Sequence, residues 1–251
     1  MQAGNRMNAS AAQTGLDQLL AQMPQAVWRA NEMAQAAASV LHTGYAALDA
    51  ELPGAGWARS CLTELLLPHP GIGEMQLLKP ALARLSAERR IALIQPPYIP
   101  HAAACQRWGW QTDKLLWIAV DQQRDALWAA EQILRSGSCG GLLLWQDVLR
   151  PEALRRLNLA AQAADTWCWL LRSDSVQQQA SPAALRLLLA PDAAGLQVQV
   201  IKRRGPHTAR RLLLDLPDMP LNRHWQGNDH VTLDLHSSAV SSARSPATLL
   251  V

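Results

Sequence analysis

The chain has 251 residues, a formal net charge of +3 and an apolar fraction of 49%. These values predict one domain with tails and a sizeable core, and so weak a positive charge does not by itself indicate nucleic-acid binding. The four cysteines have no zinc-finger or CxxC spacing, and no signal peptide or membrane-spanning run is visible, so a cytoplasmic protein without a metal site and without membrane contact is expected.

The predicted elements begin with a helix over residues 16–37, divided at Pro24, after a loose polar start. A short helix around residues 45–51 and a Pro-Gly turn follow. Strands are then predicted at 60–67, 91–97, 114–120, 141–148, 167–172, 184–191 and 195–204, and helices at 74–89, 101–110, 123–137 and 150–166.

The alternation of strand and helix through residues 60–172 predicts an α/β fold, with a mostly parallel central sheet flanked by helices and right-handed crossovers. The last two strands predict an antiparallel C-terminal extension. We expect an N-terminal segment over residues 1–40, a core domain over 41–216 and a mostly disordered tail over 217–251, because that tail is rich in polar and small residues.

The stretch 63–85 has the outline of a phosphate-binding loop, because an apolar run ends in a turn with two glycines and a helical pattern follows. A working loop, G-x-x-x-x-G-K-[ST], cradles phosphate with backbone N–H groups, a lysine and a Mg²⁺-binding hydroxyl. When Gly73 is aligned with the second glycine, Pro68, Glu74 and Met75 replace the first glycine, the lysine and the hydroxyl. Pro68 offers no N–H to a phosphate. Glu74 would repel the phosphate where a lysine would attract it, and that attraction is worth roughly 4 kcal/mol at about 4 Å and a dielectric of about 20.

The same residues have a structural interpretation. Gly71 and Gly73 suit a tight strand-to-helix turn, and Glu74 would be a favourable charge at a helix N-terminus. Pro80 falls past the first turn of a helix that starts at Glu74, so the helix is expected to kink or to begin later.

Two other positions of a nucleotide site also lack the groups they need. Gln146 stands where a strand should end in a metal-binding Asp, and Asp147 comes one residue late, which would turn it to the opposite face. Pro97 occupies the place of a water-activating Glu. We therefore expect no ATP hydrolysis, no bound cofactor and no catalytic residues.

The densest group of cations lies in the segment KRRGPHTARR, on the last predicted strand and the turn after it. Its members are Lys202, Arg203, Arg204, Arg210 and Arg211. One interpretation is a solubilising sheet edge. The other is a patch that contacts the phosphates of DNA or a DNA-bound partner.

The segment TGYAALDAELPGAGWARSCLTELL resembles the part of RecA-type proteins that leads through a small helix and a Gly-rich turn into the nucleotide-loop strand. The segments WGWQTDKLL and QILRSG extend this resemblance, which covers about residues 43–204. Within that group the chain is similar to the ImuA family, also filed as SulA-related, which shares a TGxxxLDxxLPGGGW start and an HPGIGE loop.

This resemblance implies a RecA-like core in the SOS-induced, mutagenic translesion DNA synthesis machinery. Its partners there would be ImuB, an inactive Y-family polymerase relative, and an error-prone DnaE-type polymerase, with RecA itself and DNA as further candidates. We therefore expect a non-catalytic adaptor. One alternative is a SulA-like inhibitor of the tubulin-like division protein, although SulA proteins are shorter and start later in this fold. Another is an ATPase with an unconventional site.

Overall fold

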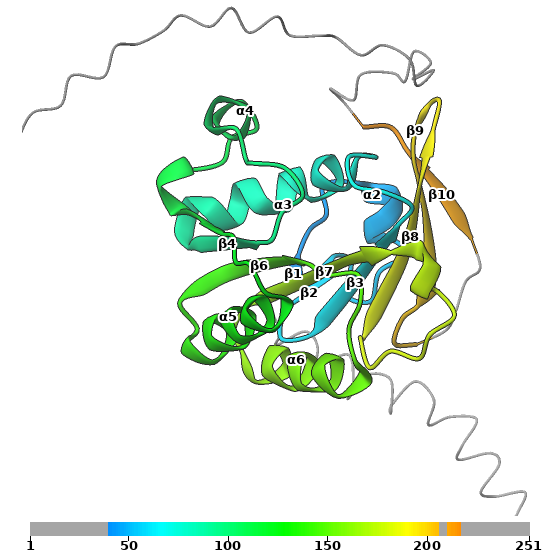
Figure 1. The fold of residues 1–251 in the computed structure, drawn as a ribbon. Helices are drawn as coiled ribbons and strands as arrows, with labels where there is room; N and C mark the ends of the chain where they lie inside the picture. The colour runs from blue at the N-terminus through cyan, green and yellow to red at the C-terminus, as the bar shows by residue number, and fades with distance from the viewer. Residues whose placement is uncertain (1–39, 206–209, 217–251) are drawn as a thin grey trace, which may run out of the picture. The chain divides into compact units, whose positions relative to one another are not determined.

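An eight-stranded sheet forms the centre of the computed structural model, which describes residues 40–205 and 210–216 (Figure 1). Its strand order is β10-β9-β8-β3-β7-β6-β4-β5. The strands from β5 to β8 run parallel, whereas β9 is antiparallel to β8 and β10 to β9. The prediction of an α/β fold with a mostly parallel sheet and an antiparallel C-terminal extension is confirmed.

The strands of this sheet are β3 (Leu62–Leu67), β4 (Arg90–Ile94), β5 (Leu115–Ile118), β6 (Cys139–Trp145), β7 (Trp167–Ser173), β8 (Leu185–Asp192), β9 (Gly195–Lys202) and β10 (Arg211–Leu214). The helices are α2 (Ala46–Asp49), α3 (Glu74–Glu88), α4 (Ala102–Arg107), α5 (Gln123–Ser136) and α6 (Pro151–Ala163), with 3-10 turns η1 (Thr112–Lys114) and η2 (Asp174–Val176). A separate antiparallel ribbon joins β1 (Val40–Leu41) and β2 (Trp57–Ala58).

Most predicted elements are present with shifted ends. The strand expected to continue to residue 204 ends at Lys202, and β10 follows it without having been predicted. The ribbon of β1 and β2 was also not predicted, because two-residue strands carry no periodic pattern. The predicted helix at 16–37 and the predicted tail at 217–251 lie outside the described residues.

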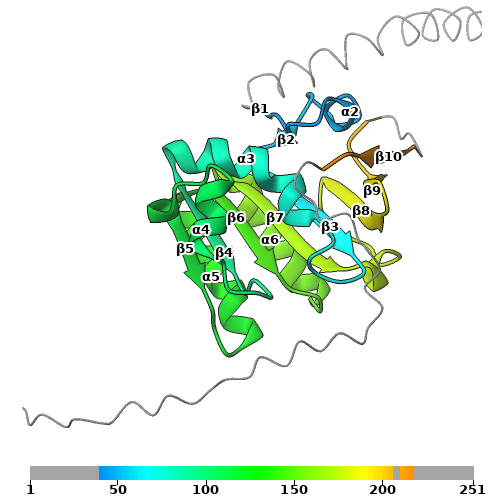
Figure 2. The same ribbon diagram turned by 90° about the horizontal axis from the view of Figure 1, so that it is seen from above.

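Helices cover both faces of the sheet: α3 and α4 lie on one face, and α5 and α6 on the other (Figures 1 and 2). The side chains of β3 alternate between the two, because successive residues of a strand point to opposite faces. Leu65 joins the apolar cluster with α3, and Leu62 joins the cluster with α5 and α6. The central strands are therefore buried on both sides, which agrees with their nearly continuous apolar sequences.

Helix α3 begins at Glu74 and continues through Pro80, so the expectation of a later start is wrong. A proline has no N–H, and the carbonyl of Gln76 therefore loses its donor within the helix. The Tyr45 hydroxyl replaces it by donating to the Gln76 carbonyl at 3.0 Å. Gly44 allows this contact, since a Cβ there would lie 2.6 Å from the Pro80 ring. The TGY sequence, residues 43–45, thus packs against α3 and compensates for Pro80; we call it the strap on α3.

A buried ionic cluster crosses the middle of the sheet. Glu64 on β3 pairs in register with Arg186 on β8, and its Oε2 accepts from Arg186 Nε at 2.7 Å. Arg172 Nη1 lies 3.6 Å from Glu64 Oε1, and Ser181 Oγ donates to the same oxygen at 2.6 Å. Burial lowers the pKa of Arg172, while the Glu64 carboxylate opposes that shift. One carboxylate therefore stabilises two buried cations.

Candidate functional site

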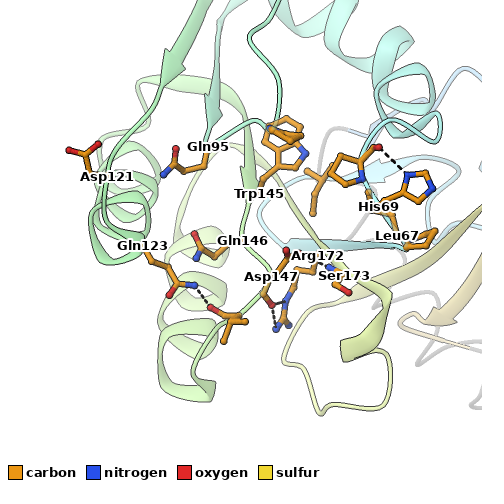
Figure 3. Close-up of a pocket in the computed structure, with 15 residues that line it drawn as sticks. Leu67, His69, Gln95, Asp121, Gln123, Trp145, Gln146, Asp147, Arg172 and Ser173 are labelled. Carbon is orange, nitrogen blue, oxygen red and sulfur yellow. Dashed lines mark hydrogen bonds between the residues drawn. The ribbon is translucent and has the colours of Figure 1, made fainter. Parts of the chain in front are cut away.

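The carboxyl ends of the parallel strands surround a pocket of about 590 Å³ (Figure 3). In open α/β sheets, ligands bind at this edge, where neighbouring connections leave in opposite directions. The lining comes from the ends of β3, β4, β6 and β7, the loops that follow them, and the connection from β5 into the start of α5: Leu67, Pro68, His69, Pro70, Gln95, Pro97, Asp121, Gln123, Trp145, Gln146, Asp147, Val148, Leu171, Arg172 and Ser173.

The loop between β3 and α3 already holds a carboxylate of its own chain. Gly71 and Gly73 have φ angles of +90° and +117°, which confirms the predicted tight turn. Glu74 Oε1 accepts from the Gly71 N–H at 2.8 Å, and Oε2 accepts from the Gly73 N–H at 3.2 Å. Glu74 is only 3% exposed. Backbone N–H groups that could cradle a phosphate are therefore bound to an internal anion beside the helix N-terminus.

Pro68 and Met75, the other two residues that differ from a working phosphate loop, also lack groups that could bind phosphate or Mg²⁺. Pro68 is exposed and lines the large pocket, where its ring offers no donor. Met75 is partly buried and packs against the core cluster under α3. Glu74 and Met75 instead line a smaller apolar pocket of about 190 Å³ beside the large one.

The residues at the end of β6 hold the neighbouring strand. Asp147 Oδ1 accepts from the Ser173 N–H at 2.8 Å, and the Asp147 carbonyl accepts from Arg172 Nη2 at 3.1 Å. Gln146 lines the pocket, as does Pro97. The structure thus brings Pro68, Pro97, Gln146 and Asp147 together around one pocket, so Asp147 is not turned away from it, and Asp147 also binds the end of β7.

Sequence reasoning missed the role of Gln95, which follows β4. Gln95 has a φ of +54°, rare for a residue with a side chain. Its side-chain amide donates to the Val120 carbonyl and accepts from the Val120 N–H, so it holds the chain after β5. No local motif marks such a residue, because its partner lies 25 positions away.

Apolar side chains are exposed next to this region. Tyr98 and Ile99 line the smaller pocket and are 70% and 73% exposed. Trp108 also lines it and packs against Trp110 with ring centroids 5.2 Å apart. Trp117 on the edge strand β5 is 50% exposed. Aromatic residues that stay exposed are typical anchors of protein interfaces.

The five predicted cations do not form one uniform patch. Lys202 Nζ donates to the Ser181 carbonyl at 2.6 Å, and Arg203 Nη1 lies 3.6 Å from Glu51 Oε2. These two side chains therefore tie the end of β9 to the chain itself. Arg204, Arg210 and Arg211 are exposed.

In the part of the chain that the structure describes, no three His, Cys, Asp or Glu side chains are grouped as metal ligands would be. The helices described there are all too short or too polar to cross a bilayer. The four cysteines are free and buried, and burial raises the pKa of each thiol.

Comparison with known proteins does not assign the chain to a family. No family model matches the chain, and no curated protein matches it. Among solved structures, SulA from Pseudomonas aeruginosa is similar at 26% sequence identity and a TM-score of 0.38. The match covers 44% of this chain and 97% of the SulA chain. A likeness this weak assigns neither fold nor function.

Proposed function

We propose that the protein is a non-catalytic, RecA-like adaptor of the SOS-induced mutagenic translesion DNA synthesis machinery. It acts there with an ImuB-type Y-family polymerase relative and an error-prone DnaE-type polymerase. The sequence resemblance supplies the partners. The mostly parallel sheet with its antiparallel extension supports a RecA-like core.

The observation that carries the non-catalytic part is the Glu74 carboxylate in the loop. A nucleotide phosphate would have to displace this buried anion from the N–H groups of Gly71 and Gly73. The displaced carboxylate would then face the phosphate at close range, which costs several kcal/mol at about 4 Å. Since no lysine follows Gly73 to offset that repulsion, the loop serves as a fixed connection between β3 and α3.

The adaptor part is supported by surface chemistry. Tyr98 and Ile99 are exposed and line a small apolar pocket, and Trp117 is exposed on the edge strand β5. Exposed aromatic and aliphatic groups beside a pocket are common at protein interfaces. An adaptor needs such a surface, whereas a nucleotide-hydrolysing enzyme needs the loop that is closed here.

Two measurements test this proposal. Calorimetric titration with Mg-ATP at near-physiological salt should show no dissociation constant in the low micromolar range or below, a range that begins at about −8 kcal/mol. Capture of the tagged full chain from DNA-damaged cells should retain the translesion polymerase components. Low-micromolar ATP binding would overturn the non-catalytic assignment, and retention of the tubulin-like division protein instead of polymerases would favour the SulA-like alternative.

A further inference from the structure

A separate pocket lies at the amino end of β3. Its volume is about 190 Å³, and its wall is the turn of the PGAG sequence, residues 53–56. Val40, Pro53 and Leu185 give it apolar surface, while Arg59 and Arg204 also line it. The sequence resemblance includes this turn, but the proposed function assigns it no role.

The backbone around this pocket is strained. Ala55 and Ser60 have φ angles of +60° and +56°, in the left-handed region that side chains disfavour. Gly56 is closely packed as well, because a Cβ there would lie 2.5 Å from the Leu41 carbonyl oxygen. Ser60 Oγ donates to the Ala164 carbonyl at 2.7 Å and holds the strained segment in place. Strained backbone of this kind persists where surroundings enforce it, and it clusters at ligand clamps.

The two arginines of the pocket are arranged differently. Arg59 Nη1 lies 2.5 Å from Asp165 Oδ1, and its guanidinium sits 5.3 Å from the centroid of the Trp167 ring. It is therefore held rigidly in place. Arg204 is exposed, and within residues 40–205 and 210–216 it makes no ion pair. The rim thus offers a positive charge that attracts a negatively charged partner.

The pocket itself selects between two classes of negative partner. Single-stranded nucleic acids bind through aromatic side chains that stack on bases, as well as through cations. None of the described residues that line this pocket is aromatic. Its aliphatic wall instead fits an aliphatic side chain, with carboxylates of the same segment placed at the arginine rim.

We propose that the PGAG pocket binds an acidic peptide segment of a partner protein, with an aliphatic residue in the pocket and a flanking carboxylate at Arg204. This inference rests on the proposed adaptor function and names one contact through which it would operate. It assigns Arg204, one of the five predicted cations, to a protein partner and not to DNA.

The test uses the full chain and a display library of random ten-residue peptides. Selected peptides are expected to be rich in Asp and Glu around Leu, Ile or Val. In fluorescence anisotropy, Arg204→Glu should weaken their binding by at least about tenfold, because a rim attraction becomes a repulsion. Ala58→Leu, which fills the pocket without changing charge, should weaken it similarly.

Arg155→Glu is the matched control, since it makes the same charge change on an exposed position of α6. It should change affinity by less than about twofold if long-range charge is unimportant. Unfolding midpoints of all variants show whether each one is folded. Selected peptides without acidic and aliphatic residues, or equal weakening by Arg204→Glu and Arg155→Glu, would overturn the proposal.

Two competitors identify other occupants. Displacement of the peptides by the oligonucleotide dT15 would assign the surface to nucleic acid, and displacement by a synthetic peptide of residues 1–39 would assign the pocket to the chain's own segment. Either result contradicts the proposal. Capture of polymerases by the Arg204→Glu chain would leave the adaptor function intact without this pocket, so the two proposals fail separately.

Discussion

The two ends of strand β3 have opposite chemistry. At the carboxyl end, the loop after Leu67 directs its N–H groups at the chain's own Glu74 carboxylate. At the amino end, a pocket lies open beside Arg59 and an exposed Arg204. One end is an anion site that is already filled, and the other presents cations with room for a partner. The two ends of one strand therefore differ in the charge of the side chains that reach them.

The largest expected loss of stability comes from Glu64, which lies on β3 between its two ends. Glu64→Gln leaves Arg186 buried without its carboxylate and leaves Arg172 with Asp147 alone, and removing one partner of a buried ion pair costs about 3–5 kcal/mol. Urea unfolding should show that loss, whereas Glu88→Gln on the exposed end of α3 should change stability by less than about 0.5 kcal/mol. A loss below about 1 kcal/mol for Glu64→Gln would show that Glu64 does not hold the strand.

The next effect tests the filled end. Glu74→Ala leaves the N–H groups of Gly71 and Gly73 without their acceptor, which should cost about 1–3 kcal/mol. If the loop is an anion site, sodium phosphate should restore part of this loss in Glu74→Ala, because a bound ligand stabilises the folded state. The same phosphate should not produce that extra gain in the wild type. Sodium chloride at equal ionic strength is the control, and equal responses of both proteins to phosphate would contradict the comparison.

The amino end should show a pH dependence through Cys168, which pairs in register with Leu62. Burial raises the pKa of this thiol above its ordinary value of 9.0. The folded state therefore keeps a proton that the unfolded state loses, so the contribution is fully present below pH 9 and falls as the pH rises. The slope is about 1.4 kcal/mol per pH unit for one thiol. Urea unfolding between pH 8 and 10.5 in reductant should show that the free energy of unfolding falls less steeply with pH in Cys168→Ala than in the wild type. Identical slopes would show that the Cys168 thiol does not cause this pH dependence.

The smallest effect concerns the strap on α3. Tyr45→Phe removes the donor to the Gln76 carbonyl and should cost about 1 kcal/mol. Pro80→Ala returns an N–H to that carbonyl, so Tyr45→Phe should cost less in the Pro80→Ala background. A double-mutant cycle by chemical denaturation measures this coupling. Additive losses would mean that the hydroxyl and the missing N–H are unrelated.

The strands and helices were largely predictable because each is a local pattern. Short apolar runs identified the buried parallel strands, and α5 ends at Gly137, which takes a left-handed conformation. Pro151 stands at the start of α6, where a missing N–H costs nothing. The element ends were less predictable, since β10 depends on pairing with β9 and not on its own four residues.

The candidate site was predictable only in what it lacks. The sequence shows that Pro68, Glu74 and Gln146 cannot act as a nucleotide loop and metal site, because residue type alone excludes that chemistry. It does not show that the Glu74 carboxylate binds the loop, since that contact depends on two positive φ angles and a particular side-chain direction. The expectation that α3 begins later because of Pro80 was wrong for the same reason: the compensating Tyr45 hydroxyl lies 31 positions before Gln76.

The sequence by itself determined the fold class, the turn between β3 and α3 and the loss of a conventional phosphate site. These follow from apolar periodicity, glycine placement and residue charge, all of which are local. Only the tertiary structure decided that Lys202 and Arg203 bind their own chain and that Arg204 stays exposed beside a pocket. Those assignments depend on which distant carbonyls and carboxylates each side chain reaches, and chain folding alone fixes those distances.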